Sequence, residues 1–127
     1  MPDASATTHR APDGLPARIQ HYIDGAFVDS VDGDTFGVLD PVTNEVYVRA
    51  AAGKQADIDL AVAAAARAFA EGPWPQMLPR ERSRVLHRIA DIVESRDARL
   101  AELESFDSVL PITQALGHAR RAAENFR

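Results

Sequence analysis

The 127-residue sequence predicts an α/β protein in which two short β-hairpins precede four amphipathic helices. Up to Gly53, short runs of β-forming residues alternate with turn residues, which is typical of hairpins. Beyond Gly53 the apolar residues recur at helical spacing instead. Two hairpins and four helices with no core sheet make a poor independent domain, so we expect the chain to be a truncated part of a larger fold.

The first hairpin is predicted within residues 22–28, where Asp24-Gly25 separates two β-forming runs. Asp-Gly between such runs is the strongest short-range hairpin signal. A second strand–turn–strand unit is predicted within residues 35–48. Its turn contains Pro41, which fixes φ, and Asn44, which tolerates a positive φ.

The first helix is predicted from Asp57 to Phe69, because its apolar residues form one stripe. Asp57 and Asp59 lie in its first turn, where we expect their negative charges to interact favourably with the helix dipole and to be solvated. Gly72-Pro73 is expected to end the helix. The residues of the stripe are Ile58, Val62, Ala65 and Phe69.

Three further helices follow in the prediction. The second begins near Pro79, a favoured first helical residue, and carries apolar and charged residues on opposite sides. Asp97 is expected to be the N-cap of a short third helix that runs through Leu103, and Pro111 to open a fourth. The fourth pattern continues to Arg127 without a cap or breaker, which again indicates truncation.

Composition restricts the partners and the location. Residues 1–18 contain few apolar residues among Pro, Gly, Ser and Thr, so we expect a disordered tail before a folded unit at residues 19–127. The formal net charge is −5 with both signs interleaved, so neither nucleic acid nor an anionic membrane is expected as a partner. The sequence contains neither a membrane-spanning run nor a signal peptide, so we expect a cytoplasmic location.

Motifs and composition predict no active site. The chain has no cysteine, which excludes disulfides and a thiolate nucleophile. The glycines are too dispersed for a phosphate-binding loop, and the serines lack a nucleophile-elbow context. The histidines lack metal-ligand spacing, which favours surface or packing roles; they are His9, His21, His87 and His118.

The arginines of the second helix and the single tryptophan leave alternatives open. The arginines could form a basic patch, but acidic residues alternate with them, which favours a solvated, ion-paired face. Trp74, between two prolines, could stack on a ligand, although packing favours a hydrophobic anchor for the loop. The arginines are Arg80, Arg82, Arg84 and Arg88, and the acids are Glu81, Asp91 and Glu94.

From Ile19 to Arg127, the order and spacing of several segments resemble the opening of aldehyde dehydrogenases. These segments are His21-Tyr22-Ile23-Asp24-Gly25, Thr35-Phe36, Leu39-Asp40-Pro41-Val42-Thr43-Asn44-Glu45-Val46, Asp57-Ile58-Asp59, Gly72-Pro73-Trp74, Arg80-Glu81-Arg82, and Glu104-Ser105 with Asp107. Leu110-Pro111-Ile112 and Arg121-Ala122-Ala123-Glu124-Asn125-Phe126 look most similar to the 5-carboxymethyl-2-hydroxymuconate semialdehyde dehydrogenases of aromatic catabolism. One departure is Ser108-Val109, where that family usually has Thr-Gly or Asn-Gly.

This resemblance implies the beginning of a cofactor-binding α/β domain in an enzyme that oxidises an aldehyde to a carboxylate. It implies NAD or NADP as cofactor, a small-molecule aldehyde as substrate and a homo-oligomer for the full-length enzyme. Members of the family attack the aldehyde with a cysteine that lies far downstream of the matching segments. Because the thiohemiacetal step needs a thiolate, we expect these 127 residues alone to be inactive.

The resemblance also implies half of a structural Na⁺ or K⁺ site. Its ligands here would be the backbone carbonyl of Leu39 and the carboxylate of Asp107, and the third ligand would lie downstream. A helix-loop cap is an equally good interpretation of Asp107, because aspartate is a common capping residue.

Two other interpretations of the whole chain remain. The exposed apolar helix faces could make it a non-enzymatic interaction module, or a regulator that binds an intact homologue. Alternatively, the chain is the decay product of a frameshifted gene, which would aggregate or be proteolysed on expression.

Overall fold

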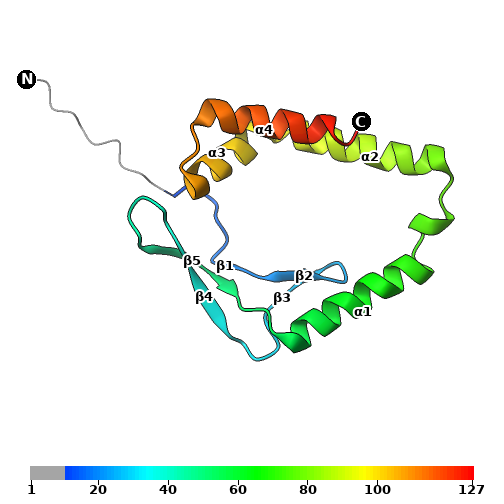
Figure 1. The fold of residues 1–127 in the computed structure, drawn as a ribbon, viewed down its shortest axis with the longest axis horizontal. Coiled ribbons are helices and arrows are strands. Elements are labelled where there is room, and N and C mark those ends of the chain that lie inside the picture. Colours follow the sequence, from blue (N-terminus) through cyan, green and yellow to red (C-terminus); the bar gives the residue numbers. More distant parts are fainter. Residues whose placement is uncertain (1–10) are drawn as a thin grey trace, which may run out of the picture.

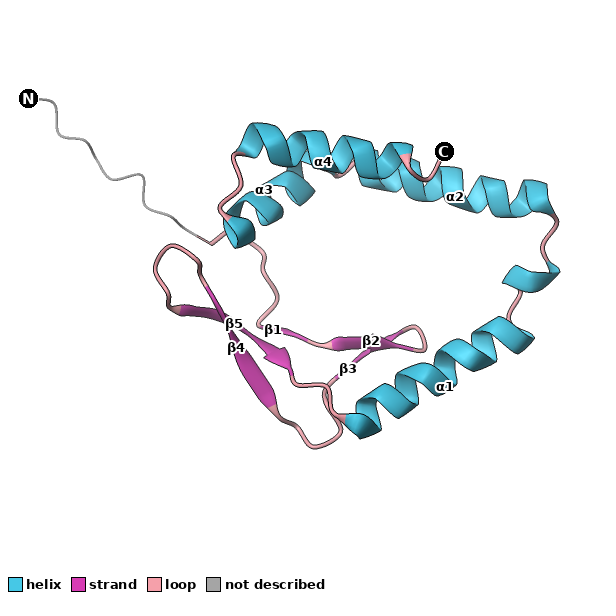
Figure 2. Ribbon diagram, in the orientation of Figure 1, coloured by secondary structure: helices cyan, strands magenta, loops and turns pink. Residues whose placement is uncertain are grey.

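The structure is a computed structural model in which residues 11–127 are described. Two small sheets and a succession of helices follow one another around an open, ring-like path (Figures 1 and 2). The strands are β1 (Arg18–Ile19), β2 (His21–Ile23), β3 (Ala26–Val28), β4 (Thr35–Leu39) and β5 (Val46–Ala51). The helices are α1 (Gln55–Glu71), the 3-10 helix η1 (Trp74–Gln76), α2 (Pro79–Glu94), α3 (Asp97–Ser108) and α4 (Ile112–Glu124). The predicted α/β class is confirmed.

The first predicted hairpin is the two-stranded sheet of β2 and β3. Asp24 and Gly25 form its turn with φ of 53° and 81°, and two successive positive φ angles match the twist of antiparallel strands. Tyr22 lies opposite Phe27 in the register, and their ring centroids are 5.0 Å apart. The Asp-Gly signal was therefore sufficient to predict this element.

The second predicted hairpin is formed by β4 and β5, which pair antiparallel. Asn44 has a φ of 59°, as its place in the predicted turn allows. Val38 lies opposite Val48, whereas Leu39 lies opposite Val46. Tyr47 is thus an extra residue on β5, a β-bulge of the kind that redirects a side chain.

A third strand joins this sheet from a segment where no strand was predicted. β1 pairs in parallel with β5, so the sheet has the order β1-β5-β4. The predicted tail covers residues 1–18, of which 1–10 lie outside the described residues. In the remainder, the backbone carbonyl of Asp13 accepts a hydrogen bond from Arg99, and Arg18 forms an ion pair with Asp29.

The first two helices agree with the prediction. α1 extends two residues beyond the predicted range at each end and is followed by Gly72 at the C-cap, as expected. α2 begins at Pro79, the predicted first helical residue. Glu81 in its first turn accepts a hydrogen bond from the backbone N–H of Leu78, which lies at the N-cap.

Three details of α3 and α4 differ from the prediction. Asp97 is the first residue of α3 rather than its N-cap, which is Arg96. Pro111 is the N-cap of α4, and the helix starts one residue later. α4 ends at Glu124 and Asn125 is its C-cap, so the expectation of a continuous pattern to Arg127 was wrong. Apolar periodicity located the helices, but the first and last turns depend on backbone angles that periodicity does not report.

The core of the described chain is built mainly from small side chains. α4 contacts α2 and α3, and the side chains at this junction include the fully buried Ala90, Ala101, Ala115 and Ala123. In contrast, many large apolar side chains of the described residues are exposed, and Phe69 reaches 82%. No helix within residues 11–127 is long and apolar enough to cross a membrane. The helices pack closely only where alanine lets them approach, and much of the apolar surface is left uncovered.

Candidate functional site

Tyr47 brings together the two segments that carry the predicted cation ligands. Its hydroxyl donates a hydrogen bond of 2.7 Å to Oδ1 of Asp107, at the end of α3. Its ring meets that of Phe106 edge-on, with centroids 5.0 Å apart. Leu39 pairs with Val46, the residue before Tyr47. Tyr47 therefore contacts Asp107 through its hydroxyl, and Leu39 is paired with the residue that precedes Tyr47.

The environment of Tyr47 changes its acidity. Partial burial and the hydrogen bond to the Asp107 carboxylate raise the pKa of Tyr47 to about 12. Both effects disfavour the phenolate, because a charged oxygen would lose solvation and would face another negative charge. The Tyr47 side chain is therefore neutral at physiological pH and keeps its proton toward Asp107.

The two predicted ligands are of a chemical type that suits an alkali cation. A backbone carbonyl and a carboxylate are hard donors, as Na⁺ and K⁺ require, and among the described residues Oδ2 of Asp107 accepts no hydrogen bond. The structure gives no support to a capping role for Asp107, because its side chain bonds to Tyr47 and not to the end of α3. Hydroxyl–carbonyl bonds hold that end instead, from Ser105 to Leu110 and from Ser108 to Glu104.

A second polar centre, which the sequence did not predict, lies at the start of α1. Asp57 is only 4% exposed, and its carboxylate accepts hydrogen bonds from the backbone N–H groups of Lys54 at 2.9 Å and Val31 at 2.8 Å. These bonds lower the pKa of Asp57, because they favour the charged carboxylate. The expectation that Asp57 is solvated was wrong, because its carboxylate is buried and also connects the segment at Val31 to the start of α1. Its first-turn position predicted the dipole role, and no local pattern predicts the contact with Val31.

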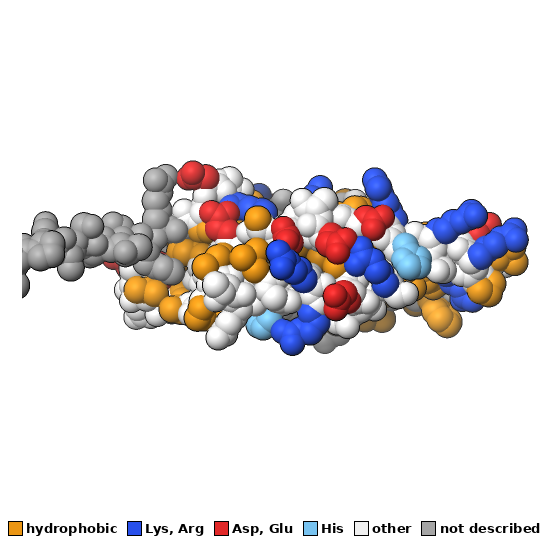
Figure 3. Space-filling view, turned by 90° about the horizontal axis from the view of Figure 1, so that it is seen from above, with side chains coloured by type: hydrophobic (Ala, Val, Ile, Leu, Met, Phe, Trp, Pro, Cys, Tyr) orange, Lys and Arg blue, Asp and Glu red, His pale blue; other side chains and the backbone are white. Residues whose placement is uncertain are grey.

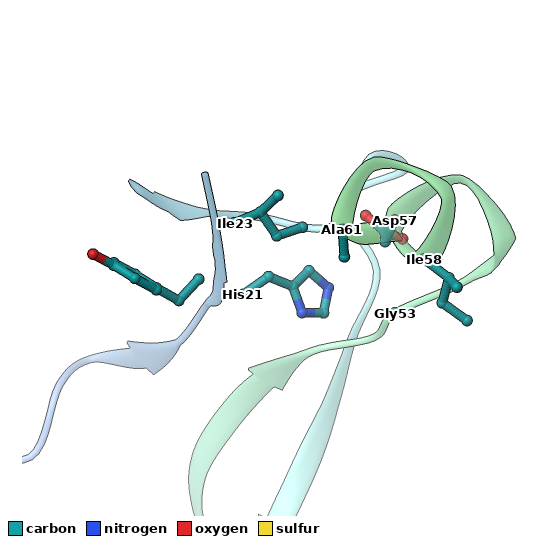
Figure 4. Close-up of a pocket in the computed structure, with 7 residues that line it drawn as sticks. His21, Ile23, Gly53, Asp57, Ile58 and Ala61 are labelled. Carbon is teal, nitrogen blue, oxygen red and sulfur yellow. The ribbon is translucent and has the colours of Figure 1, made fainter. Parts of the chain in front are cut away.

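The pocket beside Asp57 is drawn in Figure 4. The ring of His21 points from β2 toward Gly53 and α1, and its Nε2 is buried without a hydrogen-bond partner (Figure 4). A Cβ at Gly53 would lie 3.2 Å from the His21 ring, so glycine allows the ring to pack there. The lining residues are His21, Tyr22, Ile23, Gly53, Asp57, Ile58 and Ala61. Within residues 11–127, no hydrogen bond joins His21 to a carboxylate that could orient it for acid–base chemistry.

His87 and His118 are exposed, in agreement with the predicted surface roles. In the described part of the chain, no group of three His, Cys, Asp or Glu residues could hold a metal ion. Nδ1 of His118 lies 2.8 Å from Glu104, which joins α4 to α3. His9 lies outside the described residues.

The face of α2 that carries the arginines is largely exposed, as predicted, but the predicted ion pairs between these arginines and the acids of α2 do not form. Asp91 and Glu94 pair with Arg127, at 3.6 and 2.5 Å, and the hydrogen bond from Arg127 lowers the pKa of Glu94. Glu81 binds the backbone at the start of α2. Within residues 11–127, no ion pair involves Arg80, Arg82, Arg84 or Arg88. Seen from above, the molecule shows acidic and basic side chains mixed together, with basic ones gathered toward one end (Figure 3).

Comparison with known proteins gives consistent matches. A family model described as "Aldehyde dehydrogenase family" matches residues 27–127. Aldehyde dehydrogenase family 2 member B4, mitochondrial, of Arabidopsis thaliana is 53% identical over 97 residues, which are 76% of this chain and 18% of that protein. The mitochondrial benzaldehyde dehydrogenase of Antirrhinum majus is 43% identical over 114 residues, or 87% of this chain and 21% of that protein.

A solved structure shows the same arrangement of elements. The NAD⁺ complex of aldehyde dehydrogenase from Bacillus cereus is similar with a TM-score of 0.82 and 36% identity, over 87% of this chain and 23% of that chain. The chain spans about a fifth of the length of the relatives that it matches.

Proposed function

The chain belongs to the aldehyde dehydrogenase family, and from this membership we propose that it serves in an enzyme that oxidises an aldehyde to a carboxylate. Residues 19–127 would be the N-terminal portion of the cofactor-binding domain. The observation that carries this proposal is the match of residues 27–127, together with a TM-score of 0.82 to an aldehyde dehydrogenase.

NAD or NADP is the cofactor in this proposal, and an aldehyde of aromatic catabolism is the substrate. The similar Bacillus cereus structure contains NAD⁺, which favours NAD. One relative is named benzaldehyde dehydrogenase, which favours an aromatic aldehyde. The narrower substrate, a 5-carboxymethyl-2-hydroxymuconate-type semialdehyde, rests on the segments at residues 110–112 and 121–126.

We also propose that these 127 residues do not turn over an aldehyde by themselves. The chain has no cysteine to form the thiohemiacetal from which hydride leaves. Purified residues 1–127 should therefore form no NADH from NAD and benzaldehyde. Aldehyde-dependent turnover that persists after a second, orthogonal purification would overturn this part of the proposal.

A monovalent cation beside Tyr47 completes the proposal. The Leu39 carbonyl and the Asp107 carboxylate would hold Na⁺ or K⁺, and the ion would join β4 to the end of α3. This role is structural, because a bound cation between two elements resists their separation.

An exchange of segments tests the catalytic proposal. Residues 27–127 would replace the matching segment of the Bacillus cereus aldehyde dehydrogenase, and NADH formation would be followed with an aromatic and an aliphatic aldehyde. The chimaera should retain kcat within roughly tenfold of the parent, because the downstream catalytic groups are unchanged. A folded chimaera that binds NAD and forms no NADH would contradict the proposal. The unmodified parent, carried through the same purification, is the control.

The second candidate function is an interaction module without catalysis. It is favoured by the exposed apolar residues of the described chain, of which Phe69 is 82% and Phe27 71% exposed. A monodisperse, folded 127-residue chain that binds an intact homologue at a defined stoichiometry would support this alternative. Aggregation of the chain on expression would count against it.

A further inference from the structure

A hollow lies at the elbow where α1 ends, η1 turns and α2 begins. Its volume is roughly 520 Å³, and it is open to solvent. Its lining residues are Ala68, Phe69, Trp74, Pro75 and Arg82. The hollow therefore combines an apolar wall, two aromatic rings and one positive charge, and it shares no residue with the site at Tyr47.

The two aromatic rings of the hollow have unused faces. Phe69 is 82% exposed and Trp74 is 42% exposed. The ring contacts of the described residues pair Tyr22 with Phe27 and Tyr47 with Phe106, and they include neither Phe69 nor Trp74. Exposed aromatic faces favour stacked or edge-on contact with another ring.

Arg82 is the only charged residue among the described residues that line the hollow. It is half-buried, whereas Arg84 on the same helix is exposed. A spacing of seven residues places Arg82 on the face of α2 that carries Ile89, away from Arg84. Within residues 11–127, the Arg82 side chain forms no ion pair and no hydrogen bond to a side chain or backbone. A guanidinium partly withdrawn from water without an anionic partner is costly, and a carboxylate can pair with it through two parallel hydrogen bonds.

Within residues 11–127, no acidic side chain forms an ion pair with this guanidinium. Glu81, the acid next to Arg82 in sequence, binds the backbone N–H of Leu78. Asp91 and Glu94, further along α2, pair with Arg127. The positive charge of Arg82 is therefore available to a ligand from solution.

We propose that this hollow is a binding site for an aromatic carboxylate. The carboxylate pairs with Arg82, and the ring of the ligand lies against Trp74 and Phe69. A neutral aromatic compound would leave the guanidinium unpaired. A phosphate would be bound by only one cationic side chain and would otherwise contact apolar residues, so a carboxylate attached to an aromatic ring fits the hollow better. The inference is independent of the catalytic proposal, because it uses no cofactor and none of the residues beside Tyr47.

Trp74 reports on the site directly, because it is the only tryptophan of the chain. Phenylacetate would be titrated into the 127-residue chain, and the emission of Trp74 would be followed at an excitation wavelength that phenylacetate does not absorb. Phenylacetamide is the matched neutral probe. We expect a saturable change with phenylacetate and roughly tenfold or more weaker binding of phenylacetamide, because a hydrogen-bonded charge is lost.

Arg82→Gln should weaken phenylacetate binding by roughly tenfold or more, and Arg84→Gln should leave it unchanged. Circular dichroism checks the fold of both variants. If Arg82→Gln fails to fold, Arg82→Lys replaces it and should bind less tightly than the unmodified chain, since an ammonium lacks the bidentate geometry.

Several results would overturn the proposal. These are the absence of a saturable emission change, equal binding of phenylacetate and phenylacetamide, or undiminished binding by the Arg82 variant. A change of Trp74 emission with protein concentration, matched by a dimer in sedimentation, would also overturn it by showing that a second copy fills the hollow.

Discussion

The hydroxyl of Tyr47 donates a 2.7 Å hydrogen bond to Oδ1 of Asp107, which lies sixty residues further along the chain. Tyr47 is the extra residue of a β-bulge, and Asp107 belongs to the last turn of α3. The contact therefore joins β5, the strand that pairs with β4, to the end of α3.

This contact predicts an unusual titration of Tyr47. Its pKa is about 12 in the folded chain, against 10.0 for an unperturbed tyrosine, so its stabilising effect is present below pH 10 and is lost as the pH rises through about 12. Asp107→Asn should lower the Tyr47 pKa, because the negative charge is removed. Phenolate absorbance in a Tyr22→Phe background measures this, since the chain has two tyrosines.

The same titration tests the proposed cation. K⁺ or Na⁺ bound at Asp107 would offset the carboxylate charge and lower the pKa of Tyr47, whereas choline at equal ionic strength would not. Asp107→Asn should abolish the difference between the salts. Identical titrations in potassium and choline chloride would count against a cation beside Tyr47.

We expect the folded chain to lose stability in acid because of Asp57. Its folded pKa is lowered by the N–H groups of Lys54 and Val31, so its contribution is present above the ordinary value of 3.8 and is lost as the pH falls through the folded value. Asp57→Asn should reduce stability at neutral pH and flatten the decline below about pH 3.8. Urea unfolding at a series of pH values measures both effects. Asp59→Asn, on the exposed side of α1, is the control and should keep the decline; an equal decline in both variants would refute this role of Asp57.

We expect replacement of Val109 by glycine to stabilise the folded chain. It is the C-cap of α3 with φ 54° and ψ 28°, a left-handed conformation that is strained for a β-branched residue. Val109→Gly should raise the unfolding free energy by roughly 1 kcal/mol, because relief of strain exceeds the extra entropy of unfolded glycine. The midpoint of urea unfolding should rise at constant slope. Val109→Ala retains a Cβ at positive φ and should gain less; no gain in the glycine variant would show that the helix end is unstrained.

Local signals predicted much of the fold. Asp24-Gly25 predicted one hairpin, and Gly72-Pro73 predicted the end of α1. These signals act over a few residues, where backbone sterics decide the conformation. At Val109, however, α3 ends left-handed although the residue is valine rather than glycine.

Long-range pairing accounts for what the sequence did not predict. β1 has two residues and no periodicity of its own, and it exists because β5 offers an unpaired edge. The bulge at Tyr47 depends on the register of β4 against β5. The partners of Arg127 and Asp57 likewise come from other elements. Because Glu94 pairs with Arg127, the alternating charges along α2 do not form the ion pairs that their order in the sequence suggested.

The proposed cation site at Leu39 and Asp107 depends on the contact between β5 and α3. Nuclear Overhauser spectroscopy of the folded chain measures it directly, through the ring protons of Tyr47 and Phe106, whose centroids lie 5.0 Å apart. We predict strong cross-peaks between the two rings, and their weakening in Asp107→Asn. A folded chain with well-dispersed amide signals and no cross-peak between these rings would contradict the account.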